Sequence, residues 1–306
     1  MSDFSIQSPL VFNVFKPVNI TSYDVIRHFK KNLPKGFGKI GHFGTLDPFA
    51  CGVLLIGINQ ATKINNIIHD TFSKTYIAVG KLGVKTPTGD LTVEPSEVDD
   101  SKYLNEEIKR LPSNFLDTEF SKVFLGDYMQ SPHSYSASKY DGKALHEWAR
   151  EGVMIKKDQV KRNITLLQIL KYSFPWVSFR VTVSSGTFVR SLFEDMAKHL
   201  GTYGSLKALV RESIGPSHMT NALKKNNWPT LGEQNILKHG KCMNEVLPLP
   251  EIDLDPATAK KYLNGIPFLV KNDLQNQQKI WVKNNHQIVG MGEILDGYCK
   301  VVFNIA

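Results

Sequence analysis

The feature that most constrains this chain is a glycine-rich segment, residues 38–48, followed almost at once by an apolar run, residues 52–58. Glycine lets the backbone turn sharply and lets a ligand approach it closely. The segment ends in Asp47 and Pro48, and the stiff proline ring helps to fix where the preceding carboxylate points. The sequence therefore predicts a rigid loop that holds a carboxylate beside a buried hydrophobic element.

A carboxylate in such a loop can act as a nucleophile or as a general base. His42 and Thr45 in the same segment can donate hydrogen bonds to a ligand. Asp is also a routine turn residue, so an isolated Leu-Asp-Pro more often caps a turn than catalyses a reaction. The chain has no GxxxxGK[ST], GxSxG or HExxH motif, and its nine histidines show no paired metal spacing. We therefore expect no metal site.

Two further residues, Arg190 and Tyr76, could have either a role in an active site or only a structural role. Arg190 follows Gly186 and falls in the first turns of an expected helix, where the helix dipole disfavours a cation. It is either a surface arginine or the partner of a buried carboxylate, which it would keep ionised. Tyr76 lies in an expected strand, where tyrosine is usually a core or surface residue. It gains a role only if it faces a pocket in which a base can stack on it.

Hydrophobic periodicity and turn residues predict an α+β chain. The expected strands are residues 11–15, 74–82 and 174–184, and the expected helices are residues 23–31, 101–110, 143–150 and 187–200. Residues 33–44 and 126–143 are expected to be irregular. After a boundary at residues 248–250, the pattern predicts a helix at 256–263 and strands at 279–282, 287–292 and 298–303.

Net charge and cysteine content indicate which partners and which cellular compartment to expect. The net charge of +8 and the isoelectric point of about 9.2 favour an anionic partner such as a nucleic acid, although many basic proteins have none. The three cysteines are far apart and form no CxxC pair, which fits a reducing compartment. The N-terminus shows no secretory signal and no apolar run could span a bilayer. We expect a cytoplasmic protein without a membrane segment.

Five segments resemble, in the same order, the motifs of the tRNA pseudouridine-55 synthase family, the TruB type. They are FKP at 15–17, GHFGTLDP at 41–48 with its continuation to 63, KTY at 74–76, residues 131–152, and SGTFVR at 185–190 with its continuation to 211. The resemblance covers roughly residues 11–216. It implies a pseudouridine synthase domain over residues 1–247, with a mixed, mainly antiparallel sheet flanked by helices. An RNA-gripping insertion is expected at about 124–152, and a small β-rich, PUA-like module over 248–306.

The resemblance also implies the reaction. Asp47 is expected to be the catalytic carboxylate, which either attacks the ribose C1′ or starts proton removal at C2′; the residues do not choose between these routes. The glycosidic bond of an extruded uridine breaks, the uracil rotates, and C5 joins C1′. The residues expected to bind the substrate are His42, Tyr76, Phe188, Arg190 and Leu209. No cofactor is expected.

The expected partner is the T-arm stem-loop of tRNA, bound without a guide RNA by a monomer in the bacterial cytoplasm. The residues expected to contact RNA are Lys16, Lys39, His133, Lys139 and Arg150. Each of them taken alone is more often a solvated surface residue. Contact with RNA is favoured by the set as a whole and by the resemblance.

One position departs from the family pattern. Phe188 stands where the family usually has tyrosine, so a hydroxyl is missing, and we expect packing to be the main task of this ring. Three other functions fit parts of the sequence: a tRNA-binding folding assistant, an RNA-guided relative that modifies ribosomal RNA, and a hydrolase that uses Asp47 as an acid. The presence of Asp47, Tyr76 and Arg190 disfavours the first and the insertion disfavours the second. The third lacks a second carboxylate at a suitable spacing.

Overall fold

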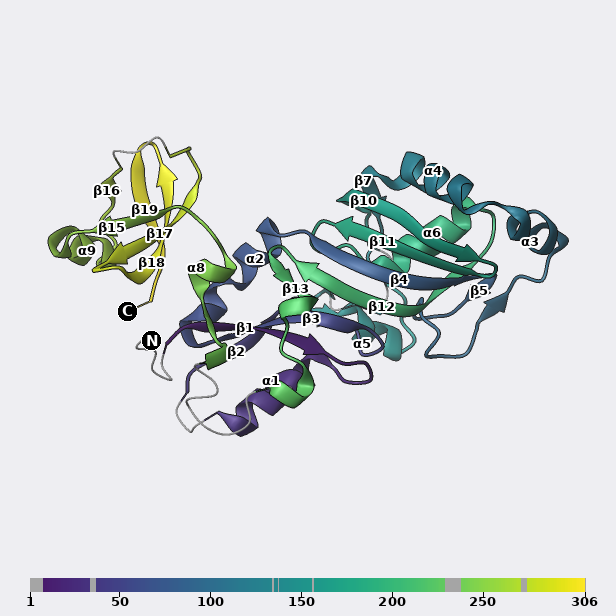
Figure 1. The fold of residues 1–306 in the computed structure, drawn as a ribbon, viewed down its shortest axis with the longest axis horizontal. Helices are drawn as coiled ribbons and strands as arrows, with labels where there is room; N and C mark the ends of the chain where they lie inside the picture. The colour runs from purple at the N-terminus through teal and green to yellow at the C-terminus, as the bar shows by residue number, and fades with distance from the viewer. Residues whose placement is uncertain are drawn as a thin grey trace.

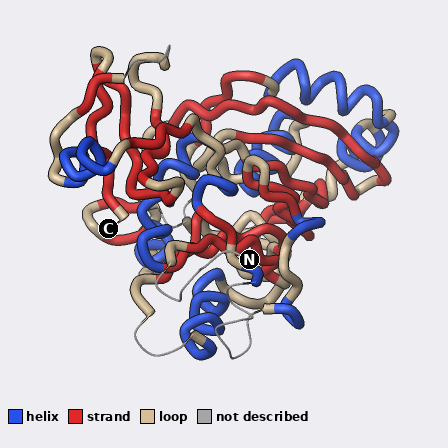
Figure 2. The backbone as a smooth tube through the Cα atoms, turned by 60° about the vertical axis from the view of Figure 1, so that its left-hand side comes forward, coloured by secondary structure: helices blue, strands red, loops and turns tan. Residues whose placement is uncertain are grey.

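Two separate β-sheets organise the chain, one in a large body and one in a C-terminal module (Figure 1). The computed structural model describes residues 8–33, 37–133, 135–136, 138–155, 157–228, 238–270 and 274–305. Within these residues the larger sheet has ten strands and the smaller has five. Helices flank the larger sheet (Figure 2), so the expected α+β architecture is confirmed.

The larger sheet is mixed but mainly antiparallel, as expected. Its strands are β1 (Leu10–Lys16), β2 (Ile40–Phe43), β3 (Cys51–Ile58), β4 (Lys74–Leu82), β7 (Gly126–Gln130), β10 (Val160–Ser173), β11 (Trp176–Val183), β12 (Gly204–Ile214), β13 (Ser217–His218) and β14 (Lys241–Cys242). Their order is β14-β1-β3-β12-β4-β11-β10-β7, with β2 beside β3 and β13 beside β12. Among these described pairs only β3 and β12 run parallel.

The helices are short and lie at the faces and ends of this sheet. They are α1 (Ser22–Asn32), α2 (Asn65–Thr71), α3 (Lys102–Glu106), α4 (Ser113–Phe124), α5 (Leu145–Arg150), α6 (Val189–His199) and α8 (Met243–Val246). Four 3₁₀ turns are described: η1 (Asn59–Ile64), η2 (Ile108–Arg110), η3 (Met219–Asn221) and η4 (Lys225–Asn227). Two small ribbons pair β5 (Val84–Lys85) with β6 (Glu97–Val98), and β8 (Lys139–Tyr140) with β9 (Lys143–Ala144).

Local sequence explains the best-defined elements. Helix α1 begins at a capping box in which the Thr21 side chain accepts from the backbone of Asp24 and the Asp24 carboxylate accepts from the backbone of Thr21. Its residues Val25, Ile26 and Phe29 are buried at helical spacing. In β4 buried and partly buried residues alternate along the whole strand, as a sheet covered on one face requires.

Two segments expected to be irregular contain strands. Residues 40–43 pair with β3, with Ile40 opposite Ile58 and Phe43 opposite Leu55. Residues 126–130 pair with β10 in the same way. The predictions for these segments were wrong because their regular structure depends on partner strands elsewhere in the chain, which glycine content does not reveal.

Three hydrophobic clusters fill the body. Helices α4 and α6 pack on one face of β4, β10, β11 and β12. Helix α1 packs on β1 and β3, whose alternate residues face the opposite side and meet α2 and α8. Both faces of the sheet are therefore covered at β1 and β3. The site described below lies in the connection between β2 and β3.

The described residues of the C-terminal module form a five-stranded sheet and one helix. Its strands are β15 (Glu251–Leu254), β16 (Phe268–Leu269), β17 (Lys279–Asn284), β18 (Gln287–Leu295) and β19 (Tyr298–Asn304), and its helix is α9 (Pro256–Leu263). It rests against the body through Trp281, which is fully buried and donates from its indole nitrogen to the Leu247 carbonyl at 2.8 Å. Lys63 of the body reaches the Asn304 carbonyl of the module at 2.6 Å.

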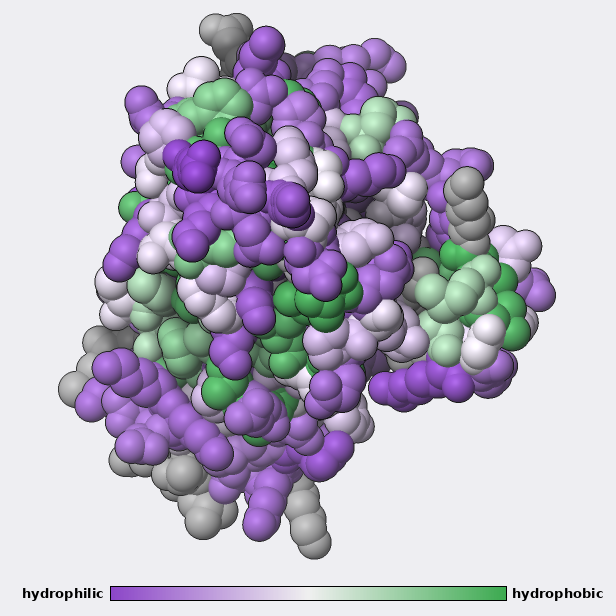
Figure 3. Space-filling view, turned by 90° about the vertical axis from the view of Figure 1, so that its right-hand side faces the viewer, coloured by the Kyte–Doolittle hydropathy of each residue, from purple (hydrophilic) through white to green (hydrophobic). Residues whose placement is uncertain are grey.

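The face of the molecule shown in Figure 3 is mainly polar. On the face shown in Figure 3, hydrophobic side chains form small separate groups among hydrophilic ones. Among the described helices none is long and apolar enough to cross a membrane.

Candidate active site

The loop that carries Asp47 is held on both sides of this residue. The Ser22 hydroxyl accepts from the Leu46 backbone N–H at 2.9 Å and donates to the Leu46 carbonyl at 3.1 Å. Past Asp47, the backbone N–H of Asn19 donates to the Pro48 carbonyl at 2.7 Å. The Leu46 side chain is buried, whereas the Asp47 side chain is 34% exposed. The carboxylate is thus fixed in direction and still open to a substrate.

Arg211 stiffens the same loop from beneath. Its side chain is buried, and its guanidinium donates to the carbonyls of Val53 at 2.7 Å, Thr45 at 3.1 Å and Gly44 at 3.0 Å. These three bonds join β12 to the start of β3 and to the approach of Asp47. Such fixed donors and acceptors hold a reactive group in position without the cost of reorganising it during the reaction.

Arg190 meets the carboxylate of Asp47 through two nitrogens. Its Nε lies 3.0 Å from Oδ2 and its Nη2 lies 3.2 Å from Oδ1. The guanidinium is almost fully buried and also donates to the carbonyls of Thr88 at 2.6 Å and Tyr135 at 3.1 Å. The structure therefore decides between the two interpretations of Arg190, and the surface arginine is excluded. The bidentate fork fits a planar carboxylate better than a lysine would.

Asp90 is a functional candidate that the sequence did not reveal. Its carboxylate is buried, lies 3.7 Å from Nη1 of Arg190 and accepts from the Thr92 backbone N–H at 3.1 Å. Arg190 is thus shared between one buried carboxylate and one half-exposed carboxylate. The sequence TPTGD at 86–90 is typical of a turn, and no local signal connects it to Arg190.

Gln130 is a second residue that the sequence did not reveal. Phe188 is the N-cap residue of α6, and no side chain caps the helix there. Instead the Gln130 side chain holds the Phe188 backbone: Oε1 accepts from its N–H at 2.8 Å and Nε2 donates to its carbonyl at 3.0 Å. Gln130 is buried at the end of β7, within the expected insertion at about 124–152. It ties the insertion to the helix that carries Arg190.

The residues expected around the uracil gather next to this loop. Tyr76 and Leu209 are buried in one cluster together with Leu46. Tyr76 stands opposite Arg211 in the β4–β12 pairing. The Phe188 side chain is partly buried, and no described hydrogen bond involves it. The structure thus places an apolar surface with one phenol ring beside the loop of Asp47.

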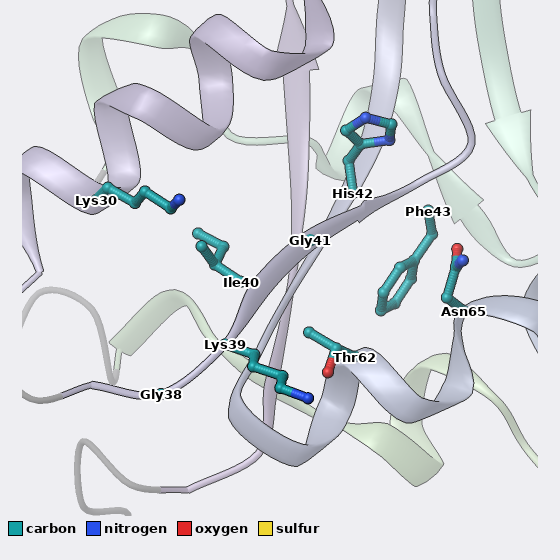
Figure 4. A pocket seen from close by; sticks show the side chains of 9 residues that line it. All are labelled: Lys30, Gly38, Lys39, Ile40, Gly41, His42, Phe43, Thr62 and Asn65. Atoms are coloured by element: carbon teal, nitrogen blue, oxygen red, sulfur yellow. The ribbon is translucent and has the colours of Figure 1, made fainter. Parts of the chain in front are cut away.

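His42 lies on β2 at the edge of a cavity of about 440 Å³ (Figure 4). Burial and, to a smaller extent, the positive charge of Arg211 lower the pKa of its imidazole, so the ring is neutral at pH 7. Its buried Nδ1 has no hydrogen-bond partner among the described residues. The cavity is lined by Lys30, Gly38, Lys39, Ile40, Gly41, His42, Phe43, Thr62 and Asn65. Both His42 and Lys39 line this cavity, so a ligand bound in it could contact them.

The residues expected to contact RNA differ in their exposure to solvent. Lys39, Lys139 and Arg150 are exposed. Lys16 is fully buried, and its ammonium donates to the carbonyls of Pro17 at 3.0 Å and Ile20 at 2.8 Å, so it holds its own loop. His133 is also buried, with Nδ1 accepting from the Tyr135 N–H at 3.0 Å. Both side chains are buried in this structure, and their expected contact with RNA stays a prediction. In the described part of the chain no cluster of three or more His, Cys, Asp or Glu could hold a metal.

A model of the N-terminal domain of TruB family pseudouridylate synthases matches residues 30–189. The chain is 38% identical over 252 residues to the tRNA pseudouridine synthase B of Thermotoga maritima, an alignment covering 82% of this chain and 77% of that protein. The chain belongs to the TruB family of pseudouridylate synthases. Its relative from Clostridium kluyveri, also named tRNA pseudouridine synthase B, is 32% identical over 298 residues, covering 95% of this chain and 98% of that protein.

Solved structures share the fold of this TruB family member at low identity. One chain of a Cbf5-Nop10-Gar1 complex superposes with a TM-score of 0.71 at 20% identity, covering 98% of this chain and 86% of that chain. A chain of an H/ACA RNP bound to a substrate RNA gives a TM-score of 0.70 at 19% identity, with the same two shares covered. Such identities support the fold alone. The expected family and reaction class are confirmed by the closer relatives, and the enzyme is an isomerase.

Proposed function

We propose that this TruB family enzyme converts uridine 55 in the T-arm of tRNA to pseudouridine, with Asp47 as the catalytic carboxylate. The observation that carries the proposal is the Asp47 side chain, half-exposed on a rigid loop and held by a buried arginine at 3.0 Å. The names of the curated relatives, tRNA pseudouridine synthase B, support tRNA as the substrate. The net charge of +8 suits a polyanionic partner.

The geometry suits a reaction in which nothing is added or lost. The C1′–N1 bond of uridine breaks, the uracil turns, a C5–C1′ bond forms, and the C5 proton leaves while N1 gains one. Asp47 begins this sequence, by attack on C1′ or by removal of the C2′ proton. Arg190 holds the two carboxylate oxygens so that one face of the group is presented to the ribose.

A uridine can reach Asp47 only outside a base stack, because ribose and both edges of the base must be accessible. Tyr76, buried beside Leu46 and Leu209, provides the flat surface on which the extruded uracil stacks. In this proposal its phenol also helps to remove the C5 proton. Neutral His42 and exposed Lys39 hold the RNA strand at the cavity beside β2.

The division of the chain is part of the proposal. Residues 1–247 form the catalytic domain with its insertion at about 124–152, and residues 248–306 form a PUA-like RNA-binding domain. A new sheet begins at Glu251, which supports this boundary. Lys139 and Arg150, exposed on the insertion, provide the grip that makes a guide RNA unnecessary. The enzyme acts as a monomer in the cytoplasm.

The test uses an unmodified T-arm stem-loop with tritium at C5 of its uridines. The purified protein, with no guide RNA or second protein, should release tritium from the uridine that matches position 55. A stem-loop with cytidine at that position is the control and should release none. Binding without release would favour the folding assistant, and release only with a guide RNA would favour the RNA-guided relative.

A further inference from the structure

The turn between β11 and α6 is contacted by two cations from different strands. Lys74 of β4 donates from its ammonium to the Ser185 hydroxyl. Arg162 of β10 donates from Nη1 to the Ser185 carbonyl at 3.2 Å. Gly186 has a φ of +79°, and a Cβ at this position would lie 2.9 Å from Nη2 of Arg162. The absence of a side chain at Gly186 is therefore what lets the guanidinium lie against the turn.

No carboxylate among the described residues forms an ion pair with these cations, although the charge of Asp70 acts on Lys74 and raises its pKa. Arg211, a third cation, lies next to Lys74 across Gly44: a Cβ there would be 3.7 Å from both side chains. In the described part of the chain, Lys74, Arg162 and Arg211 form hydrogen bonds only with backbone carbonyls and one hydroxyl, and none forms an ion pair. Lys74 and Arg211 are both buried. Buried charge without a counter-charge is costly, so an anion would be bound favourably here.

Comparison with Lys16 shows that Lys74 is the unusual lysine. Burial lowers the pKa of both side chains to about 8. The ammonium of Lys16 has two backbone carbonyls as acceptors, and the charge of Asp47 favours its protonated form more than the charge of Arg211 opposes it. The ammonium of Lys74 has one neutral hydroxyl as acceptor. The charge of Arg211 opposes its protonated form, and the charge of Asp70 favours that form to a smaller extent. The Lys74 ammonium therefore has fewer acceptors than that of Lys16, and an anion could accept a hydrogen bond from it.

The turn adjoins the reaction centre along two stretches of chain. Ser185 precedes α6, which carries Arg190 to Asp47. Gly44, which separates Lys74 from Arg211, lies in the loop that leads to Asp47. A uridine drawn out of its stack toward Asp47 brings its own flanking phosphates to the same place. Phosphate contacts also supply much of the affinity for nucleic acids and position the strand.

We propose that the Ser185–Gly186 turn, flanked by Lys74 and Arg162, binds one phosphate of the RNA strand next to the target uridine. Arg162 and the Ser185 hydroxyl contact the phosphate oxygens, and Lys74 provides charge from beneath. The site rests on the proposed function, since it is filled only when an RNA strand presents a uridine to Asp47. It would explain why two cations are kept without a carboxylate beside a turn that needs glycine.

The test pairs changes in the protein with changes in the RNA. Stem-loops carry a single uncharged methylphosphonate in place of one phosphate near the target uridine. Dissociation constants are measured with Asp47→Asn protein, so that the RNA is not converted. One position should weaken binding by about ten-fold, the size of one charge-assisted contact. With Arg162→Met added, the same methylphosphonate should have almost no further effect, and the slope of log Kd against log salt should fall by about 0.7–0.9.

Lys161→Met is the matched control. Lys161 is the neighbour of Arg162 in β10, is 67% exposed and pairs with Asp127 at 2.7 Å. Its loss removes the same charge from the protein but should leave the methylphosphonate effect at about ten-fold. Additive effects of Arg162→Met and every methylphosphonate would overturn the proposal, and so would the absence of any sensitive position.

Lys74→Met separates binding from stability. Replacing a buried cation that has no counter-charge by an apolar side chain of similar length should keep or raise the melting temperature without RNA. The same change should weaken RNA binding and lower the salt slope. A lower melting temperature with an unchanged slope would show that Lys74 only supports the turn. If the stem-loop does not bind, the same slopes are measured with a short oligouridylate, and tritium release by the wild-type protein tests the proposed function separately.

Discussion

Nε of Arg190 lies 3.0 Å from Oδ2 of Asp47, although the two residues are 143 positions apart in the chain. The same guanidinium donates to the carbonyls of Thr88 and Tyr135. Four segments therefore meet at one side chain: the loop after β2, the turn after β5, the insertion and the start of α6. Because Arg190 contacts all four, a displacement of any one of these segments is expected to move Arg190 and so change the position of the Asp47 carboxylate.

Asp47→Asn should keep RNA binding and abolish product. The amide has nearly the shape of the carboxylate but is neither a nucleophile nor a base, so only the chemical step is lost. Tritium release and the dissociation constant for the stem-loop, measured on one preparation, check this. Product formation by the variant at a rate near that of the wild type would remove Asp47 from its proposed role.

Arg190→Met should destabilise the fold as well as stop turnover. It leaves the buried carboxylate of Asp90 without its cation, and breaking a fully buried pair costs about 3–5 kcal/mol. Because Asp47 is 34% exposed, we expect a loss near the lower end of that range. The free energy of unfolding in urea measures it. Arg27→Met is the control: Arg27 is 68% exposed in a surface pair with Asp24, so less than about 1 kcal/mol should be lost. An equal loss in both variants would contradict the prediction.

Gln130→Met should lower the rate of a single turnover more than it weakens RNA binding. The variant keeps the length of the side chain but releases the Phe188 backbone, and with it the position of Arg190. A displacement of about 1 Å at a reacting group can cost roughly a hundred-fold in rate. Thr202→Val is the matched control, because it removes one partly buried hydrogen bond, from the Thr202 hydroxyl to Asp99, beyond the other end of α6. Similar losses of rate in the two variants, or a fall in binding alone, would mean that Gln130 only stabilises the fold.

Phe188→Tyr should leave turnover close to that of the wild type. Gln130 holds Phe188 by its backbone, and this does not depend on the side chain. The Phe188 ring is partly buried, and a tyrosine ring would pack in the same way. A rate gain approaching the roughly 10²–10⁴-fold of general acid–base assistance would show that the hydroxyl is chemically missing here. Single-turnover rates at saturating enzyme measure the comparison.

Lys16→Met should flatten the pH dependence of stability between about pH 8 and 10.5. Burial lowers the pKa of Lys16 from 10.5 to about 8. Within that window the unfolded chain holds the proton and the folded protein has released it, so this lysine makes stability rise with pH. Below about pH 8 both states are charged and the full cost of burial is present. Unfolding free energies of the two proteins across the window test this, with Lys161→Met as the exposed control. Parallel curves for wild type and Lys16→Met would contradict it.

Several elements could be predicted because their pattern is local. The strand at 74–82 and the helix at 256–263 coincide with β4 and α9, and the helix at 187–200 contains α6. In each of these segments, the spacing of apolar residues within a short stretch of sequence predicts which side chains are buried. Strands β2 and β7 were missed, since pairing with β3 and β10 defines them. Helix α4 and strands β10 and β12 were not assigned at all.

The sequence by itself determined the family, the reaction class, the loop of Asp47 and the candidate partner Arg190, because ordered motifs and glycine turns are properties of neighbouring residues. Only the tertiary structure decided which other groups reach that carboxylate. It brought Asp90 and Gln130 to the site, buried Lys16 and His133 away from solvent, and left Lys74 beside a turn with no ion-pair partner among the described residues. The physical reason is that burial and ion pairing depend on which distant segments pack together, and no local pattern in one chain specifies those contacts.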